Sequence, residues 1–238
     1  MEQQTIDILA FGAHADDVEI GMAGSLAKWS AAGKKIVICD LTEAELSSNG
    51  TVMTRKAEAE AASCILGIAE RINLHLPDRG LFLTEDNICT IANVIRKYKP
   101  TLIFAPYEED RHPDHGNCAR LVEEAFFSAG IRKYKVDGGY PSHKAKNLYH
   151  YYINGYTHPD FVVDISEFIE QKINALQAYQ TQFFRDDEGV STPLTEGYIE
   201  GVTARERLFG KEVGVSFAEG FSSRTPILLN KDLFGDKL

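Results

Sequence analysis

Short β-branched runs alternate with amphipathic segments through the first half of the chain. The runs read TIDILAF, KKIVICDL, RINLHL and TLIFAPY, and charged or turn-forming residues separate them from the segments between. Strands that alternate with helical patterns are typical of βαβ units, in which a helix crosses over between two parallel strands. The pattern therefore predicts the α/β fold class, with a mostly parallel sheet and helices on both of its faces.

Two of the amphipathic segments have clear helical periodicity. The first covers residues 85–98, where apolar side chains recur at spacings of three and four. They are Ile88, Ile91, Ile95 and Tyr98. The second follows Pro113, and Gly130 is placed to end it. Its apolar stripe consists of Cys118, Leu121, Val122, Ala125 and Phe126.

The pattern changes beyond about residue 135. An aromatic run, NLYHYYING, precedes a short strand, FVVDI, and then a helix that carries Ile169, Ile173, Leu176 and Phe183. Segment 184–197 is polar and rich in turn formers, which predicts an exposed loop and a candidate lid. We expect a single domain over residues 1–238, with a core in 1–134 and a C-terminal part, 135–238, that completes the fold and covers the site.

Composition narrows the class of partner. With 25 Lys and Arg against 35 Asp and Glu, the net charge is −10, which argues against a nucleic-acid or anionic-membrane surface and favours a small molecule. No run approaches the roughly 18 apolar residues of a membrane span, and the first residues do not resemble a secretion signal. The four cysteines, Cys39, Cys64, Cys89 and Cys118, form no CxxC pair. We expect buried, reduced thiols and a cytoplasmic location.

Chemistry-bearing side chains gather directly after two of the predicted strands. Residues 12–19 (GAHADDVE) follow the first strand and residues 108–115 (EEDRHPDH) follow the fourth. In doubly wound sheets, ligands bind at the carboxyl ends of the strands. Each turn offers an imidazole and a carboxylate at a spacing of three, an offset that lets two side chains in a tight turn or a first helical turn reach one ion.

These residue types fit a catalytic metal site. Asp16 and Asp17 repel each other unless a cation or a proton resolves the conflict. Three N and O ligands with a fourth position for water are typical of catalytic zinc. Spacing alone leaves open whether His112 or His115 is the third ligand. For any one of these histidines taken singly, the better explanation is a hydrogen-bonded core or surface residue.

The motifs AHADDVEIGMAG and RHPDH, supported by LTEAELSSNGT, NLHLPDRGL and TPLTEGY, resemble the LmbE/PIG-L-type deacetylases. These are metal-dependent N-acetylglucosamine deacetylases with a Rossmann-like fold. Within the family the chain is most similar to the bacillithiol-pathway branch, which acts on N-acetylglucosaminyl-L-malate. Ala15 stands where the family has Pro, at a position that offers no ligand. The resemblance also implies a homo-oligomer, since similar enzymes form hexamers.

The resemblance assigns roles to the residues of the two turns. It implies that one Zn²⁺ per chain is held by His14, Asp17 and His115. Asp16 then acts as general base. His112 is left to donate to the developing oxyanion, with Asp114 to orient it and keep it charged.

Further roles rest on weaker signals. The resemblance makes Arg55 a clamp for the malate carboxylates, against the alternative of a solvated arginine at a helix start. Asp78 and Arg79 are candidates for sugar hydroxyls, or for a simple ion pair in a turn. Tyr198, just past the candidate lid, would help to stabilise the oxyanion. Lower-ranked candidates are Ser47, Ser48 and Asn49 for the sugar pocket and Glu19 for support of the metal turn.

Three functions compete at this point. The first is a zinc-dependent amidohydrolase that removes an N-acetyl group from an N-acetylglucosamine conjugate. The second is a non-catalytic sugar- or nucleotide-binding module, although the glycines here do not form GxGxxG. The third is a metal-dependent phosphoesterase, which often uses two metals. The number of ions bound per chain separates them.

Overall fold

The computed structural model describes residues 5–185 and 189–228, which form a sheet with the strand order β3-β2-β1-β4-β5-β7-β6. The strands are β1 (Ile8–Gly12), β2 (Ile36–Asp40), β3 (Glu70–Asn73), β4 (Leu102–Pro106), β5 (Asn147–Tyr151), β6 (Phe161–Asp164) and β7 (Ala218–Ser222). Strands β1 to β5 run parallel, whereas β7 pairs antiparallel with both β5 and β6. The predicted α/β class with a mostly parallel sheet is confirmed.

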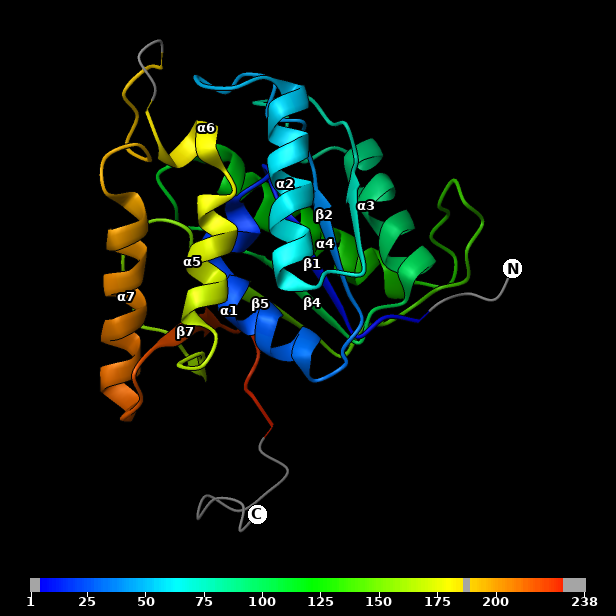
Figure 1. The fold of residues 1–238 in the computed structure, drawn as a ribbon. Helices are drawn as coiled ribbons and strands as arrows, with labels where there is room; N and C mark the ends of the chain where they lie inside the picture. The colour runs from blue at the N-terminus through cyan, green and yellow to red at the C-terminus, as the bar shows by residue number, and fades with distance from the viewer. Residues whose placement is uncertain (1–4, 186–188, 229–238) are drawn as a thin grey trace.

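Helices cover both faces of this sheet (Figure 1). They are α1 (Asp17–Ala31), α2 (Val52–Leu66), α3 (Glu85–Tyr98), α4 (Pro113–Gly130), α5 (Ile169–Gln177), α6 (Gln180–Phe183) and α7 (Tyr198–Val213). The two helices predicted from periodicity, α3 and α4, have the expected bounds. The Thr84 side chain caps α3 at its start by accepting from the backbone N–H of Asn87.

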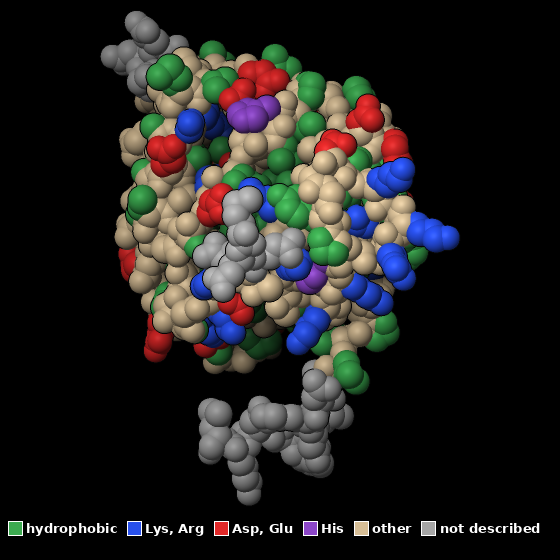
Figure 2. Space-filling view, turned by 90° about the vertical axis from the view of Figure 1, so that its right-hand side faces the viewer, with side chains coloured by type: hydrophobic (Ala, Val, Ile, Leu, Met, Phe, Trp, Pro, Cys, Tyr) green, Lys and Arg blue, Asp and Glu red, His purple; other side chains and the backbone are tan. Residues whose placement is uncertain are grey.

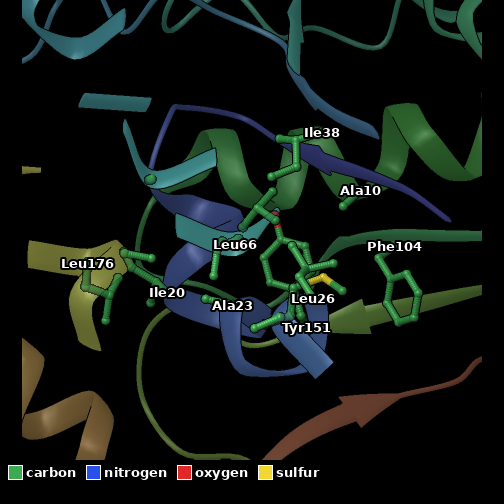
Figure 3. Packing of buried hydrophobic residues seen from close by; sticks show 14 of the residues in the cluster. Ala10, Ile20, Ala23, Leu26, Ile38, Leu66, Phe104, Tyr151 and Leu176 are labelled. Carbon is green, nitrogen blue, oxygen red and sulfur yellow. The ribbon is translucent and has the colours of Figure 1, made fainter. Parts of the chain in front are cut away.

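The alternation of side chains along each strand supplies two separate cores. Ile8 and Ala10 of β1 face a cluster formed with α1, α2 and α5, part of which Figure 3 shows. Leu9 and Phe11 face the opposite cluster, formed with α3 and α4. Successive residues of a strand point to opposite faces, so a strand covered on both sides is apolar throughout. This burial fixes the carboxyl ends of β1 and β4 side by side.

The prediction of one helix from Ile169 to Phe183 is wrong, because this segment forms two helices, α5 and α6. Tyr179, between α5 and α6, has φ −84° and ψ 65°, which is not helical. Its buried hydroxyl donates to Glu19 Oε1 at 3.0 Å. In the loop that follows, residues 189–197 contain only turns and irregular backbone, as predicted, and residues 186–188 lie outside the described residues.

Helix α1 is broken near its middle. Met22 has φ −150° and ψ 20°, so the backbone hydrogen bonds of the helix are interrupted there. The carbonyl of Ile20 instead accepts from Lys172 Nζ at 2.8 Å and from the Arg205 guanidinium at 3.1 Å. Beyond the break, the N–H groups of Gly24 and Ser25 donate to the Glu219 carboxylate at 2.9 and 2.6 Å. Side chains from the C-terminal part thus satisfy both broken ends.

The side chains that satisfy the break also balance one another in charge. Lys172 Nζ lies 2.7 Å from Glu206 Oε1 and 2.6 Å from Glu219 Oε1, and Arg205 lies 2.9 Å from Glu206. All four side chains are buried. In Figure 3, Tyr151 of β5 lies next to Leu26 of α1, which follows the break. A β carbon on Gly21 would stand 2.0 Å from that ring, so this position accepts only glycine.

The expectation of buried thiols holds for two of the four cysteines. Cys39 and Cys118 are buried as expected, but Cys64 is exposed and Cys89 is half-buried, because each lies near the outer face of its helix. Acidic and basic side chains are interspersed over the face drawn in Figure 2, with basic ones more numerous towards its right-hand edge. Among the described residues, every helix falls short of the length and apolarity that a membrane crossing needs.

Candidate metal centre

The turn after β1 places two carboxyl groups at the start of α1. Asp16 has φ 108°, a value in the left-handed region that residues with a β carbon rarely adopt. The backbone N–H of His14 donates to Asp17 Oδ2 at 2.8 Å, which closes the turn. Both aspartates are buried. Strained backbone of this kind is concentrated at functional sites, where the surrounding structure holds it in place.

The three predicted metal ligands converge at this turn. Asp17 Oδ2 lies 3.6 Å from His14 Nδ1, and Asp17 Oδ1 lies 3.1 Å from His115 Nε2. His115 comes from the first turn of α4, so the ligands follow β1 and β4, which are adjacent strands. Two imidazoles and one carboxylate are a donor set that suits zinc.

A second carboxylate holds the far nitrogen of each of these histidines. His14 Nε2 lies 3.2 Å from Asp78 Oδ1, and His115 Nδ1 lies 2.8 Å from Asp110 Oδ1. Metal-bound histidines usually make such a contact, which fixes the tautomer and the orientation of the ring. Asp78, predicted to contact sugar hydroxyls, therefore lies behind a ligand. Asp110 was not singled out from the sequence, although it stands in the polar turn after β4.

The electrostatics of the cluster favour a cation. Burial lowers the pKa of His115, but Asp17 and Asp110 outweigh it and raise that pKa to about 9. Burial likewise opposes protonation of His14, yet Asp114, Asp17 and Asp78 raise its pKa well above the usual value. Positive charge is thus stabilised at this point of the sheet edge, and a divalent ion would be stabilised by the same carboxylates. The residues present fit the expected metal.

A third imidazole lies next to this set. Nitrogens of His14, His112 and His115 all lie within 4.8 Å of one another, and the His112 ring is 4.9 Å from each of the other two ring centres. The arrangement therefore brings both sequence-based alternatives, His112 and His115, to the same place. His115 has the contacts to Asp17 and Asp110 that a ligand needs, whereas His112 faces the cavity beside them.

The expectation that Asp114 orients His112 and keeps it charged is wrong. The carboxylate of Asp114 accepts from the backbone N–H of Arg79 at 2.8 Å and from its guanidinium at 2.9 Å. It is the backbone N–H of Asp114 that donates to His112 Nδ1, at 3.3 Å. Burial and the two neighbouring histidines lower the pKa of His112. A neutral ring that accepts at Nδ1 carries its hydrogen on Nε2 and can still donate.

Asp16 and Arg55 form a buried pair beside the ligands. Arg55 lies in the first turn of α2 and is 3% exposed. A nitrogen of its guanidinium lies 3.3 Å from Asp16 Oδ2. Its guanidinium also donates to the Ala15 carbonyl and to Ser47 Oγ. The alternative of a solvated arginine is therefore wrong. Burial raises the pKa of Asp16 to about 7, although Arg55 opposes the shift. A carboxyl group in this range accepts and returns protons near neutral pH.

A cavity of about 320 Å³ opens over these side chains. Its walls include most of the residues that were predicted to bind substrate. These are Ser47, Ser48, Asn49, Arg55, Asp78, Arg79 and Tyr198. Arg111, Ile153 and Asn154, which sequence reasoning missed, also line it. Ile153 and Asn154 lie in the loop after β5, for which the sequence offers no spacing signal, whereas Arg111 lies in the polar turn after β4.

Residues 192–194 of the candidate lid form part of the same wall. The side-chain amide of Asn49 donates to the carbonyl of Val190 at 2.9 Å and accepts from its N–H at 2.8 Å. Asn49 thus holds the loop against the cavity. Glu19, which was expected to support the metal turn, instead contacts Arg71 and the Tyr179 hydroxyl.

Tyr198 closes the cavity from the first turn of α7. Its hydroxyl lies 2.9 Å from Asn154 Oδ1 and 3.1 Å from the Ile153 carbonyl. Burial raises its pKa, so the hydroxyl keeps its proton. The group is a hydrogen-bond donor directed at the edge of the cavity.

Fold and site together define an α/β protein with a candidate metal centre of histidine and aspartate side chains at the carboxyl edge of its parallel strands. The family model for PIG-L, described as GlcNAc-PI de-N-acetylase, matches residues 9–126, which contain all the candidate ligands. A conserved protein of Thermus thermophilus has a solved structure with 37% identity and a TM-score of 0.86, covering 94% of this chain and 97% of that one. The chain belongs to the PIG-L family.

Two further relatives have named activities. A diacetylchitobiose deacetylase of Thermococcus kodakarensis is 29% identical over 229 residues, which are 90% of this chain and 81% of the relative. The structure of the N,N′-diacetylchitobiose deacetylase of Pyrococcus horikoshii matches with 25% identity and a TM-score of 0.79, over 90% of this chain and 82% of that one.

Proposed function

We propose that this protein removes the N-acetyl group from an N-acetylglucosamine conjugate by metal-dependent hydrolysis of the amide. The observation that carries the proposal is the approach of Asp17 to both His14 and His115, at 3.6 and 3.1 Å, with the buried carboxyl of Asp16 in the same cavity. Membership of the PIG-L family and the likeness to two chitobiose deacetylases support it.

His14, Asp17 and His115 would hold one zinc ion, which when bound supplies Lewis acidity towards water and the acetyl carbonyl. Asp16 takes a proton from the attacking water as the new C–O bond forms. As the C–N bond breaks, Asp16 returns that proton to the departing amine, so the products are acetate and a free glucosamine amine. Arg55 keeps Asp16 in place during both transfers.

His112 and Tyr198 would stabilise the negative charge that develops on the acetyl oxygen. His112 carries its hydrogen on Nε2, because Nδ1 accepts from the backbone of Asp114. Tyr198 would turn its hydroxyl from Asn154 towards the substrate. His112 needs no such turn, and donors already in place when charge develops give the largest part of this stabilisation.

The direct test is amine release from N-acetylated sugars by the zinc-loaded protein, with chelator-treated protein as control. We expect release that stops when the metal is removed and returns when zinc is added back. One zinc per chain supports the deacetylase, two would favour a phosphoesterase, and none would favour a binding module. A zinc-loaded protein that releases no amine from any N-acetylglucosamine conjugate would refute the proposal.

We further propose that the preferred substrate is N-acetylglucosaminyl-L-malate, in bacillithiol biosynthesis in the cytoplasm. Three cations line the cavity, Arg55, Arg79 and Arg111, and a guanidinium matches a carboxylate at two points. The assay compares this conjugate with free N-acetylglucosamine and with diacetylchitobiose. A higher kcat/KM for diacetylchitobiose would contradict the malate assignment without affecting the reaction class.

Arg55→Ala separates its two roles. Loss of the contact to Asp16 lowers kcat/KM on every substrate, whereas loss of a malate contact adds about 1.5–3 kcal/mol on the malate conjugate alone. Arg55→Lys should recover part of that extra loss. Equal losses on all substrates would restrict Arg55 to support of Asp16.

We also propose a homo-oligomer, hexameric as in similar enzymes, which the molar mass in solution tests.

A further inference from the structure

Asn154 lies between the wall of the cavity and the residues behind a candidate metal ligand. It follows β5 and lines the cavity. The two ends of its side-chain amide have different partners. Oδ1 accepts from the Tyr198 hydroxyl at 2.9 Å and from Arg111 Nε at 3.0 Å, whereas Nδ2 donates to Asp110 Oδ1 at 2.9 Å. These contacts fix which way the amide points.

Asp110 is held from several sides. Its Oδ1 accepts from the backbone N–H of His112 at 2.8 Å, and its Oδ2 accepts from the backbone N–H of Asn154 at 3.1 Å. Its Oδ1 also lies 2.8 Å from His115 Nδ1. The Asn154 side chain is therefore one of the donors that decide where this carboxylate stands against the ring of His115.

We propose that Asn154 is a positioning residue that sets two groups at once, the Tyr198 hydroxyl in the cavity wall and the Asp110 carboxylate behind His115. The inference rests on the metal site of the proposed function. A carboxylate that orients a metal-bound histidine contributes about 10–100-fold to metal affinity or activity. An amide suits this position because it offers an acceptor to Tyr198 and a donor to Asp110 on one planar group.

Two substitutions separate the two ends. Asn154→Asp keeps an acceptor for Tyr198 and Arg111. At the other end it replaces the Nδ2 donor, which lies 2.9 Å from Asp110 Oδ1 in the wild type, with an oxygen that cannot donate. Tyr198→Phe leaves the Asp110 end unchanged and removes the contacts of the hydroxyl to Asn154 Oδ1 and to the Ile153 carbonyl. The matched control is Asn174→Asp, the same change in charge at an exposed position of α5. Asn154→Gln keeps both polar ends and moves them by one methylene, in case the aspartate variant does not fold.

The readouts are zinc affinity by competition with a chelator, kcat and KM on the best acetylated substrate, and thermal unfolding of the zinc-free proteins. We expect Asn154→Asp to weaken zinc binding by about 10–100-fold, with Asn154→Gln between it and the wild type. Tyr198→Phe should keep zinc affinity within about twofold and lower kcat/KM. Asn174→Asp should match the wild type in all three.

Zinc affinity is measured without turnover, so it distinguishes this proposal from the proposed function. Wild-type protein that binds no zinc would overturn the metal site and the role of Asn154 together. Normal zinc affinity in both Asn154→Asp and Asn154→Gln, with a tight wild-type site, would overturn the role of Asn154 alone. A lower melting temperature without any change in zinc affinity would show a merely structural role, and would also overturn it.

Discussion

Replacement of Lys172 by methionine tests the account of the break in α1. The Lys172 side chain is 1% exposed, and its ammonium group bonds Glu206, Glu219 and the Ile20 carbonyl at 2.6–2.8 Å. Lys172, Arg205, Glu206 and Glu219 have balanced charges in the wild type. Without Lys172 the group keeps a buried negative charge, and one of the carbonyl contacts at the break is lost.

The expected loss of stability follows from that imbalance. Removal of one partner from a buried ion pair costs about 3–5 kcal/mol, because the remaining charge stays out of water. Methionine is close to lysine in length, so a cavity adds little. For a chain of this size each kcal/mol shifts the melting temperature by about 2–4 °C, which gives a drop of roughly 6–20 °C.

The assay is urea unfolding of the zinc-free protein at several pH values. Burial opposes ionisation of Glu206, but Arg205 and Lys172 outweigh it, so its pKa lies below the ordinary 4.5. Its contribution is present above the unfolded pKa and is lost as the pH falls through the folded one. In Lys172→Met the Glu206 carboxylate loses one of the two cations that lower its pKa, so it takes up a proton more easily. The difference from wild type should therefore shrink as the pH falls from 7 towards 4.

A matched variant separates charge from packing. Lys172→Met combined with Glu219→Gln removes one charge of each sign and should recover part of the lost stability. A loss below about 1 kcal/mol in Lys172→Met, or a loss that does not change with pH, would refute the charge-balance account.

Four other expectations concern the site and the glycines. His115→Ala should lose zinc as well as activity, since two ligands do not retain the ion; full zinc content by elemental analysis would contradict it. Asp16→Asn should keep the metal while kcat falls by about 10²–10⁴, and an unchanged kcat would remove Asp16 from the mechanism. Gly21→Ala should abolish soluble folded protein, because its β carbon would lie 2.0 Å from the Tyr151 ring. Gly201→Ala in α7, where space is open, should raise stability by about 0.5–1 kcal/mol in thermal unfolding.

The parts of the fold that could be predicted from the sequence are those with a local signal. Helix α3 buries Ile91 and Ile95 at a spacing of four, and its bounds match the pattern. Strands β1 and β2 are apolar throughout because both faces are covered. The convergence of His14 and His115 followed from parallel strands, whose carboxyl ends share one edge of the sheet.

The parts that could not be predicted depend on contacts between distant residues. Strand β7 reads AEGFS, and its Glu219 and Gly220 are poor strand formers that gave no signal. Glu219 is buried there because Lys172, far from it in the sequence, neutralises it. The carboxylates behind the ligands, Asp78 and Asp110, likewise depend on loop conformation, for which no periodicity exists.

The break in α1 has a consequence for the order in which the protein matures during synthesis. Asp17 stands at the head of α1, and Lys172 and Glu219 hold the broken helix from positions 152 residues after Ile20 and 195 residues after Gly24. A chain is synthesised from its N-terminus, so the turn that carries His14 and Asp17 leaves the ribosome long before these anchors do. We expect tight zinc binding to arise late, once β7 has left the ribosome, and nascent chains that end before residue 218 to release zinc readily.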